Sequence, residues 1–160
     1  MRCTRCGRGH ASGCTGRGTP APMGPRLHVE LPADPGAAGR SRRETGRWLT
    51  SLCGADRPCE IAQDLVLAVN EAVSNCVEHG YRAAPSGTVS LRGTADGARV
   101  RMEISDRGSW REPPEDNGCR GRGLGMIEAV TEDVRVERGP GGTTVTFHGT
   151  LGRCPGVCSD

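Results

Sequence analysis

The feature that most constrains the fold is an apolar stripe in the middle of the chain. Between residues 61 and 77 apolar side chains recur every three or four positions, and Gly80 ends the pattern. The stripe consists of Ile61, Leu65, Ala68, Val69, Ala72, Val73, Cys76 and Val77. This spacing predicts an amphipathic helix that stops near the glycine. Because one face of such a helix must be buried, the rest of the chain has to provide an apolar surface against it.

Shorter segments with alternating apolar and polar residues predict that this surface is a sheet. They are residues 26–31, 88–94, 98–105, 134–136 and 143–147, and helical spacing recurs over 37–52 and 124–132. The Asp96-Gly97 pair is typical of the tight turn of a β-hairpin. The order of these elements predicts an α/β (α+β) two-layer sandwich, in which a mixed, mostly antiparallel sheet carries the helices on one face.

The two ends of the chain differ from its middle. Residues 1–24 contain four arginines, no acidic residue and almost nothing apolar. Such a segment is expected to be disordered, or to precede a true start at Met23. We therefore expect a basic, cysteine-containing tail (1–24), one domain (25–150) and a C-terminal tail (151–160).

Cysteine and histidine spacing in the basic tail leaves one alternative open. Cys3, Cys6, His10 and Cys14 resemble a zinc knuckle in which each of the two longer spacers is one residue short. A zinc-dependent nucleic-acid module is therefore one alternative for this segment. The nine cysteines of the chain are otherwise expected to be reduced in the cytosol, so we expect no disulfide framework.

Composition excludes several function classes. All 21 basic side chains are arginine, and the chain has no lysine. This excludes Walker-type phosphate loops, kinases with a strand lysine and enzymes that form Schiff bases. The net charge of +2 argues against direct nucleic-acid binding. Because no apolar run reaches the ~18 residues of a membrane span, we expect a cytoplasmic protein without membrane contact.

Polar residues that can carry chemistry lie at the ends of the predicted elements. Glu71 and Asn75 stand four residues apart on the central helix and project from one side, away from the apolar stripe. Asp106 directly follows a predicted strand, and Gly108 allows a flat ligand to approach the backbone. The next helix begins in a glycine-rich loop, Gly121 to Gly125, whose free N–H groups could hold phosphates. Each feature alone is also explained by an ordinary helix surface, a lid or a turn.

Four stretches taken together resemble the GHKL ATPase superfamily, also called the histidine-kinase-like or Bergerat fold. The stretches are LVLAVNEAVSNCVEHGYR, EISDRGSW, GRGLGMIEAVTEDVRV and GGTTVTF. Within the superfamily, residues 27–148 look most like the anti-sigma-factor serine/threonine kinases. Because all four motifs fall on the expected elements in the family's order, the joint signal is much more specific than any single motif.

The resemblance implies roles for individual residues near the reacting groups. Glu71 matches the catalytic glutamate that accepts the proton of the attacking serine hydroxyl, and Asn75 matches the asparagine that ligates Mg²⁺. His79 lies at the end of the first motif, and both a packing role and a catalytic role remain open for it. The resemblance thus implies ATP and Mg²⁺ as ligands.

The resemblance also implies which residues hold the nucleotide. Asp106 matches the carboxylate that accepts a hydrogen bond from the adenine amino group, with Gly108 making room for the ring. Thr143, or else Thr144, matches the threonine that supports adenine recognition through water. Three glycines match those that donate backbone amides to the phosphates, and either Arg120 or Arg122 is the candidate for the γ-phosphate. The three are Gly121, Gly123 and Gly125.

The implied function is an ATP-dependent protein-serine kinase that acts as an anti-sigma factor. It would sequester a sigma factor and phosphorylate an anti-anti-sigma antagonist, as a possible homodimer. A second reading is a non-catalytic ATP-binding regulatory module of the same fold. The loop at 109–120 is a short lid with Pro113 and Pro114, which keeps this second reading open, whereas Glu71 favours the enzyme.

Overall fold

The computed structural model describes residues 24–54, 59–81, 87–108 and 122–151. Five strands, three α-helices and a short π-helical turn follow one another in these ranges. In chain order they are β1 (Arg26–Pro32), α1 (Ala37–Cys53), α2 (Glu60–Asn75), η1 (Cys76–Gly80), β2 (Thr88–Asp96), β3 (Arg99–Asp106), α3 (Arg122–Val130), β4 (Glu132–Gly139) and β5 (Gly142–Thr150).

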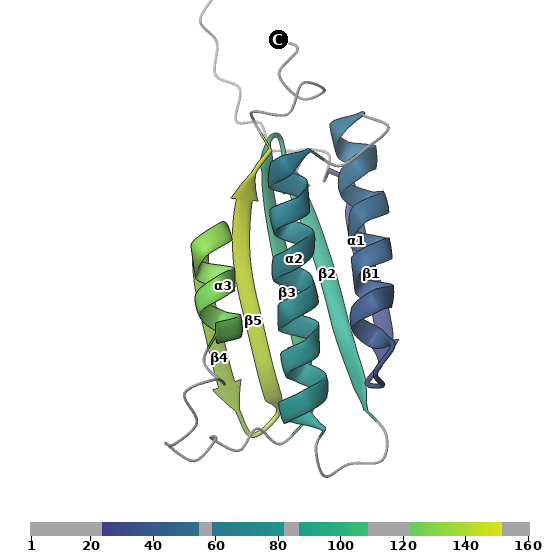
Figure 1. Cartoon of the computed structure of the whole chain (residues 1–160), viewed down its shortest axis with the longest axis vertical. Helices are drawn as coiled ribbons and strands as arrows, with labels where there is room; N and C mark the ends of the chain where they lie inside the picture. The colour runs from purple at the N-terminus through teal and green to yellow at the C-terminus, as the bar shows by residue number, and fades with distance from the viewer. Residues whose placement is uncertain (1–23, 55–58, 82–86, 109–121, 152–160) are drawn as a thin grey trace, which may run out of the picture.

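The strands form one sheet in the order β1-β2-β3-β5-β4, and each of these four neighbouring pairs is antiparallel. The helices α1, α2 and α3 lie over the same face of the sheet, with α2 in the middle (Figure 1). This arrangement confirms the two-layer sandwich predicted from the sequence. The hairpin turn is also confirmed, because Gly97 has the positive φ of 54° that such turns require.

The core lies between α2 and the middle of the sheet. On α2 the buried residues recur at helical spacing, and Leu65, Val69 and Val73 are 1% exposed or less. On the strands every second residue faces them, so Ile104 and Phe147 are fully buried. Leu151 is also in the core at 1% exposure, although the sequence analysis assigned it to the C-terminal tail.

The end of α3 differs from the helix predicted over 124–132. The helix runs from Arg122 to Val130, and β4 already begins at Glu132. Thr131 explains the early end, because both its backbone N–H and its hydroxyl donate to the Ile127 carbonyl, at 3.0 and 2.6 Å. The side chain thereby satisfies a carbonyl at the end of the helix and allows the chain to enter the strand at once.

The end of α2 also departs from a regular helix. Where the sequence predicts an α-helix up to Gly80, the last five residues form η1. The N–H of Cys76 is shared between the carbonyls of Ala72 and Val73 at this junction. A π-turn widens the helix locally, and such turns are frequent at functional sites.

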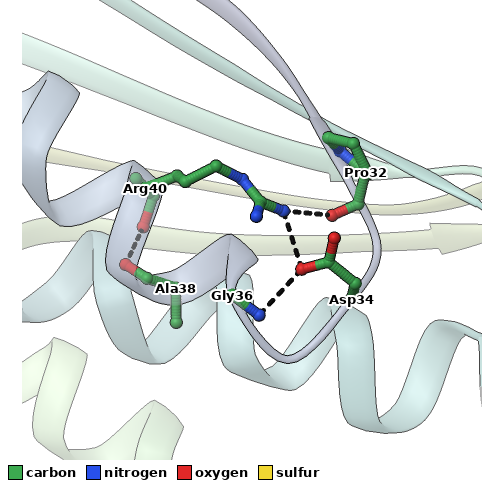
Figure 2. A network of polar contacts seen from close by, with 6 residues as sticks. Pro32, Asp34, Gly36, Ala38 and Arg40 are labelled. Carbon is green, nitrogen blue, oxygen red and sulfur yellow. Dashed lines mark hydrogen bonds and ion pairs between the residues drawn. The ribbon is translucent and has the colours of Figure 1, made fainter.

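A polar network fixes the connection between β1 and α1 (Figure 2). The Arg40 guanidinium donates to the Pro32 carbonyl at 3.1 Å and to Asp34 Oδ1 at 2.8 Å. The same Asp34 oxygen accepts the Gly36 N–H at 2.7 Å. The Arg40 guanidinium and the Asp34 carboxylate together thus join the end of the strand to the start of the helix.

Two further observations concern the remaining sequence expectations. None of the helices in the described ranges is both long and apolar enough to span a bilayer. Cys53 and Cys76 carry free thiols, as expected, but Cys59 is disulfide-bonded, which corrects the expectation that the cysteines are reduced. The tails at 1–23 and 152–160 also lie outside them.

Candidate functional site

The end of β3, the start of β5 and the turn η1 meet at one end of the sheet, at the bottom of Figure 1. Asp106 is the last residue of β3 and pairs across the ladder with Thr143 of β5. Both side chains lie on the helix-covered side, where Asp106 is 4% and Thr143 is 2% exposed. The turn η1 packs against both strands at this point. The structure therefore brings together two motifs that lie 37 residues apart in the sequence.

Asp106 and Thr143 each have one buried side-chain oxygen without a partner in the described ranges. Asp106 Oδ1 accepts the N–H of Gly108 at 2.9 Å. Asp106 Oδ2 and Thr143 Oγ1 are buried and find no hydrogen-bond partner among the residues that the structure describes. Leaving a buried acceptor unpaired costs about 1–3 kcal/mol, and more when it is charged. Such a pair of orphaned oxygens indicates a place prepared for a ligand that donates hydrogen bonds.

Glycines allow the backbone to close around Asp106. A Cβ on Gly108 would collide with the carbonyl oxygen of Gly80, and one on Gly142 would collide with the carbonyl oxygen of Asp106. Gly142 also has a φ of +120°, which side chains rarely adopt. Gly108, expected to make room for a ring, thus also makes room for the backbone of Gly80. The sequence predicted Gly80 only as the end of a helix, and so did not indicate that its backbone packs against Gly108.

Tyr81 braces the same corner. Its hydroxyl donates to the Thr88 carbonyl at 2.7 Å and accepts the N–H of Arg107 at 3.0 Å. The tyrosine therefore joins the end of η1 to the start of β2 and to the segment after β3. Sequence reasoning assigned it no role, and the only available signal was that it is the single tyrosine of the chain.

A free thiol lies beside the Asp106 carboxylate. Cys76 is 2% exposed, and burial, followed by the charge of Asp106, raises the pKa of its thiol. The thiol is therefore neutral at physiological pH. Sequence reasoning identified Cys76 as a core residue, which the burial confirms, but not its place next to the candidate ligand acceptor.

Asn75 and Glu71 lie near the end of α2 that precedes η1. The Asn75 amide faces α3, because a Cβ on Gly123 would lie 3.0 Å from Asn75 Nδ2 and 3.3 Å from Asn75 Oδ1. Glu71 lies one turn earlier on the same helix, and both side chains are partly buried. The structure thus brings Asn75 to the first turn of α3, whose free backbone N–H groups favour anions.

Several predicted residues fall outside the described ranges. Gly121 and the lid at 109–120, including Arg120, belong to these, and so do the four residues of the zinc-knuckle alternative. Arg122 is the first residue of α3, and Gly125 lies in its exposed first turn. Within the described ranges no group of three or more His, Cys, Asp or Glu side chains is placed to hold a metal ion.

The arrangement fits an adenine nucleotide. Its amino group could donate to the orphaned oxygen of Asp106, and Thr143, the register partner of Asp106 on β5, could contact the same ring through water. The Asn75 amide oxygen is a hard donor of the kind that Mg²⁺ accepts. The first turn of α3 could receive phosphate oxygens at the position next to Asn75.

Comparison with known protein families gives a match over most of the chain. Residues 31–148 match the family described as the histidine kinase-like ATPase domain. The matched segment contains Glu71, Asn75, Asp106 and Thr143, so all four sites of interest lie within it.

Individual relatives are similar at low identity. The serine-protein kinase RsbW of Oceanobacillus iheyensis is 29% identical over 128 residues, which cover 69% of this chain and 77% of that protein. The anti-sigma F factor of Thermoanaerobacter sp. is 28% identical over 109 residues, covering 61% and 76%. The serine-protein kinase RsbW of Listeria monocytogenes is 25% identical over 131 residues, covering 72% and 82%.

Proposed function

The chain belongs to the histidine kinase-like ATPase domain family, and from this membership we propose that it is an ATP-dependent protein-serine kinase that acts as an anti-sigma factor. Relatives named serine-protein kinase and anti-sigma F factor support an anti-sigma kinase role in general. The finer statement is that this chain transfers the γ-phosphate of ATP to a serine of an antagonist protein.

The observation that carries the proposal is the pair of orphaned acceptors on β3 and β5. One carboxylate oxygen of Asp106 and the Thr143 hydroxyl are buried without a partner among the described residues, which is costly unless a ligand donates to them. Asp106 would accept the adenine amino group, and Thr143 would bind the water that completes recognition of the ring. Guanine presents a carbonyl at the corresponding position, and that group would be repelled by Asp106.

The phosphates would lie toward α3. Asn75 would contribute its amide oxygen to Mg²⁺, and the backbone N–H groups at Gly121, Gly123 and Gly125 would donate to phosphate oxygens. The metal supplies neutralisation of the phosphate charge, which is the main requirement of phosphoryl transfer. Arg122, or Arg120, would provide the positive charge that a lysine provides in other kinases.

Glu71 would act on the substrate serine. Its carboxylate accepts the hydroxyl proton as the serine oxygen bonds to the γ-phosphorus and the bond from that phosphorus to the bridging oxygen breaks, releasing ADP. A positioned base contributes typically ~10²–10⁴-fold to such a step. The partners would be a sigma factor, held by the protein, and an anti-anti-sigma antagonist, which is the phosphate acceptor, with a homodimer as the possible assembly.

The proposal is tested by phosphate transfer. The full-length protein is incubated with γ-labelled ATP, Mg²⁺ and a panel of candidate antagonist proteins, and incorporated phosphate is measured together with nucleotide affinity. Glu71→Gln should remove most of the turnover and leave ATP affinity nearly unchanged. Asn75→Ala should lower both the rate and the Mg²⁺-dependent affinity, because it removes a metal ligand.

Glu60→Gln is the matched control, because Glu60 is an exposed glutamate at the opposite end of the same helix. It should behave like the wild-type protein in both assays. A Glu71→Gln protein with wild-type turnover would refute the mechanism. A wild-type protein that binds ATP but labels no antagonist would instead favour the non-catalytic binding module.

A further inference from the structure

A cavity of about 660 Å³ is lined by residues of β1, β2 and β3 and of the segments next to these strands. Glu30, Ser90 and Ser105 are register partners on β1, β2 and β3, and all three line this cavity. Because side chains alternate along a strand, Ser105 faces away from its buried neighbours Ile104 and Asp106. The cavity is therefore on the opposite side of the sheet from the candidate nucleotide site.

Cationic side chains lie on the walls of the open-face cavity. Arg107 lines it and forms no ion pair with any residue in the described ranges. Arg92 also lines it, and its ion pair with Glu103 is long, at 3.7 Å, with the arginine side chain 57% exposed. Both guanidinium groups are therefore available to an incoming anion.

Hydroxyl groups complete the donor set. Thr88 and Ser105 also line the cavity and can each donate one hydrogen bond. Tyr81, which also lines it, is already fixed by its bonds to Thr88 and Arg107. These two hydrogen bonds of Tyr81 hold the part of the cavity wall formed by Thr88 and Arg107 in place without a ligand.

We propose that this cavity binds a small phosphomonoester, whose phosphate is held between Arg92 and Arg107. Planar guanidinium groups bind phosphate with paired hydrogen bonds, and a tetrahedral oxyanion can accept further bonds from the two hydroxyls. The volume falls in the range of ~300–1,000 Å³ that is typical of small-molecule sites. The cavity thus has room for an organic group that carries the phosphate.

Glu30 limits the chemistry of that organic group. The Ser90 hydroxyl and then His28 lower the pKa of the Glu30 carboxyl, so it is ionised near neutral pH. A negative charge on this wall disfavours a ligand that is anionic throughout. It favours one whose far end carries an amine or a hydroxyl, as phosphoserine does.

The test is a calorimetric titration of the full-length protein with O-phosphoserine. Arg92→Gln should weaken binding about tenfold or more, the equivalent of losing one charge-assisted hydrogen bond. Arg135→Gln is the matched control, because Arg135 is an exposed arginine on the same open face of the sheet, paired with Thr146, and does not line the cavity. It should change the affinity less than twofold, and unphosphorylated serine should not bind.

Two further arms separate the possible interpretations. A phosphoserine peptide that binds more tightly than the free amino acid identifies a phosphorylated protein as the source of the phosphate, and the reverse order identifies a free metabolite. The titration is repeated with Asp106→Asn, which should leave O-phosphoserine binding intact. Equal losses in Arg92→Gln and Arg135→Gln, loss in Asp106→Asn, or no binding at millimolar ligand would overturn the proposed site. None of these outcomes bears on the proposed kinase function.

Discussion

The environment of the Asp106 side chain is the strongest indication of which ligand the site binds. Its second oxygen is buried without a partner in the described part of the chain, and this is unusual for a carboxylate. An asparagine would keep the shape and one acceptor but lose the charge. Hydrogen bonds to charged groups contribute about 1.5–3 kcal/mol, against about 0.5–1.5 kcal/mol for neutral ones.

We therefore expect Asp106→Asn to reduce the preference for ATP over GTP by about tenfold. The measurement is the ratio of the two dissociation constants by nucleotide titration. Glu103→Gln provides the control, because Glu103 lies on the same strand but faces the open side of the sheet. An unchanged ratio in Asp106→Asn would mean that this carboxylate does not recognise the base.

The connection between β1 and α1 shows how one charged residue positions an element (Figure 2). The Arg40 side chain and then the Gly36 N–H lower the pKa of Asp34. Because the pKa is lower in the folded state, the contribution to stability is present above the unfolded-state pKa of about 3.9. It is lost as the pH falls through the lower folded-state value.

We expect Asp34→Asn to lower the urea midpoint at neutral pH. We also expect the free energy of unfolding of this variant to fall less steeply as the pH is lowered. The comparison is made by urea unfolding at neutral pH and at a series of acid pH values, as the Asp34 carboxyl becomes protonated in the folded and the unfolded state. Asp96→Asn is the control, because asparagine is equally suited to its hairpin turn. If both variants show the same pH profile, the Asp34 contact does not stabilise the folded state.

At the scale of the whole molecule, ligand binding should stabilise the fold. A ligand that binds only the native state adds about 2.7 kcal/mol at a hundredfold excess over its dissociation constant. We expect ATP with Mg²⁺ to raise the melting temperature by several degrees, measured by thermal unfolding with and without nucleotide. An unchanged melting curve at millimolar ATP, or an equal shift with GTP, would contradict an adenine site.

The domain limits proposed from the sequence are also testable at this scale. The described chain contacts the sheet from Gly24 on, where a Cβ would collide with the Ala95 carbonyl oxygen. A protein shortened to start at Met23 should therefore fold and bind nucleotide as the full chain does. Failure of the shortened protein to fold, or one equivalent of zinc in the full-length protein, would refute the assignment of residues 1–24 as a dispensable tail.

The sequence by itself determined the elements and the layers of the fold. Apolar periodicity from Ile61 to Val77 predicted α2, and alternation along Val100, Met102 and Ile104 predicted the buried face of β3. Both patterns are local, because a side chain's face on a helix or strand depends only on its spacing. The four motifs likewise indicated the family before any contact was known.

Only the tertiary structure decided how the motifs meet. The pairing of Asp106 with Thr143, the approach of Gly123 to Asn75 and the bracing by Tyr81 are contacts between distant segments, and no local spacing encodes them. The early end of α3 at Thr131 depends on a single side-chain hydrogen bond that competes with the helix. The open-face cavity needs the register of three strands at once. Periodicity assigns a side chain to a face, but only packing determines which other side chain it meets there.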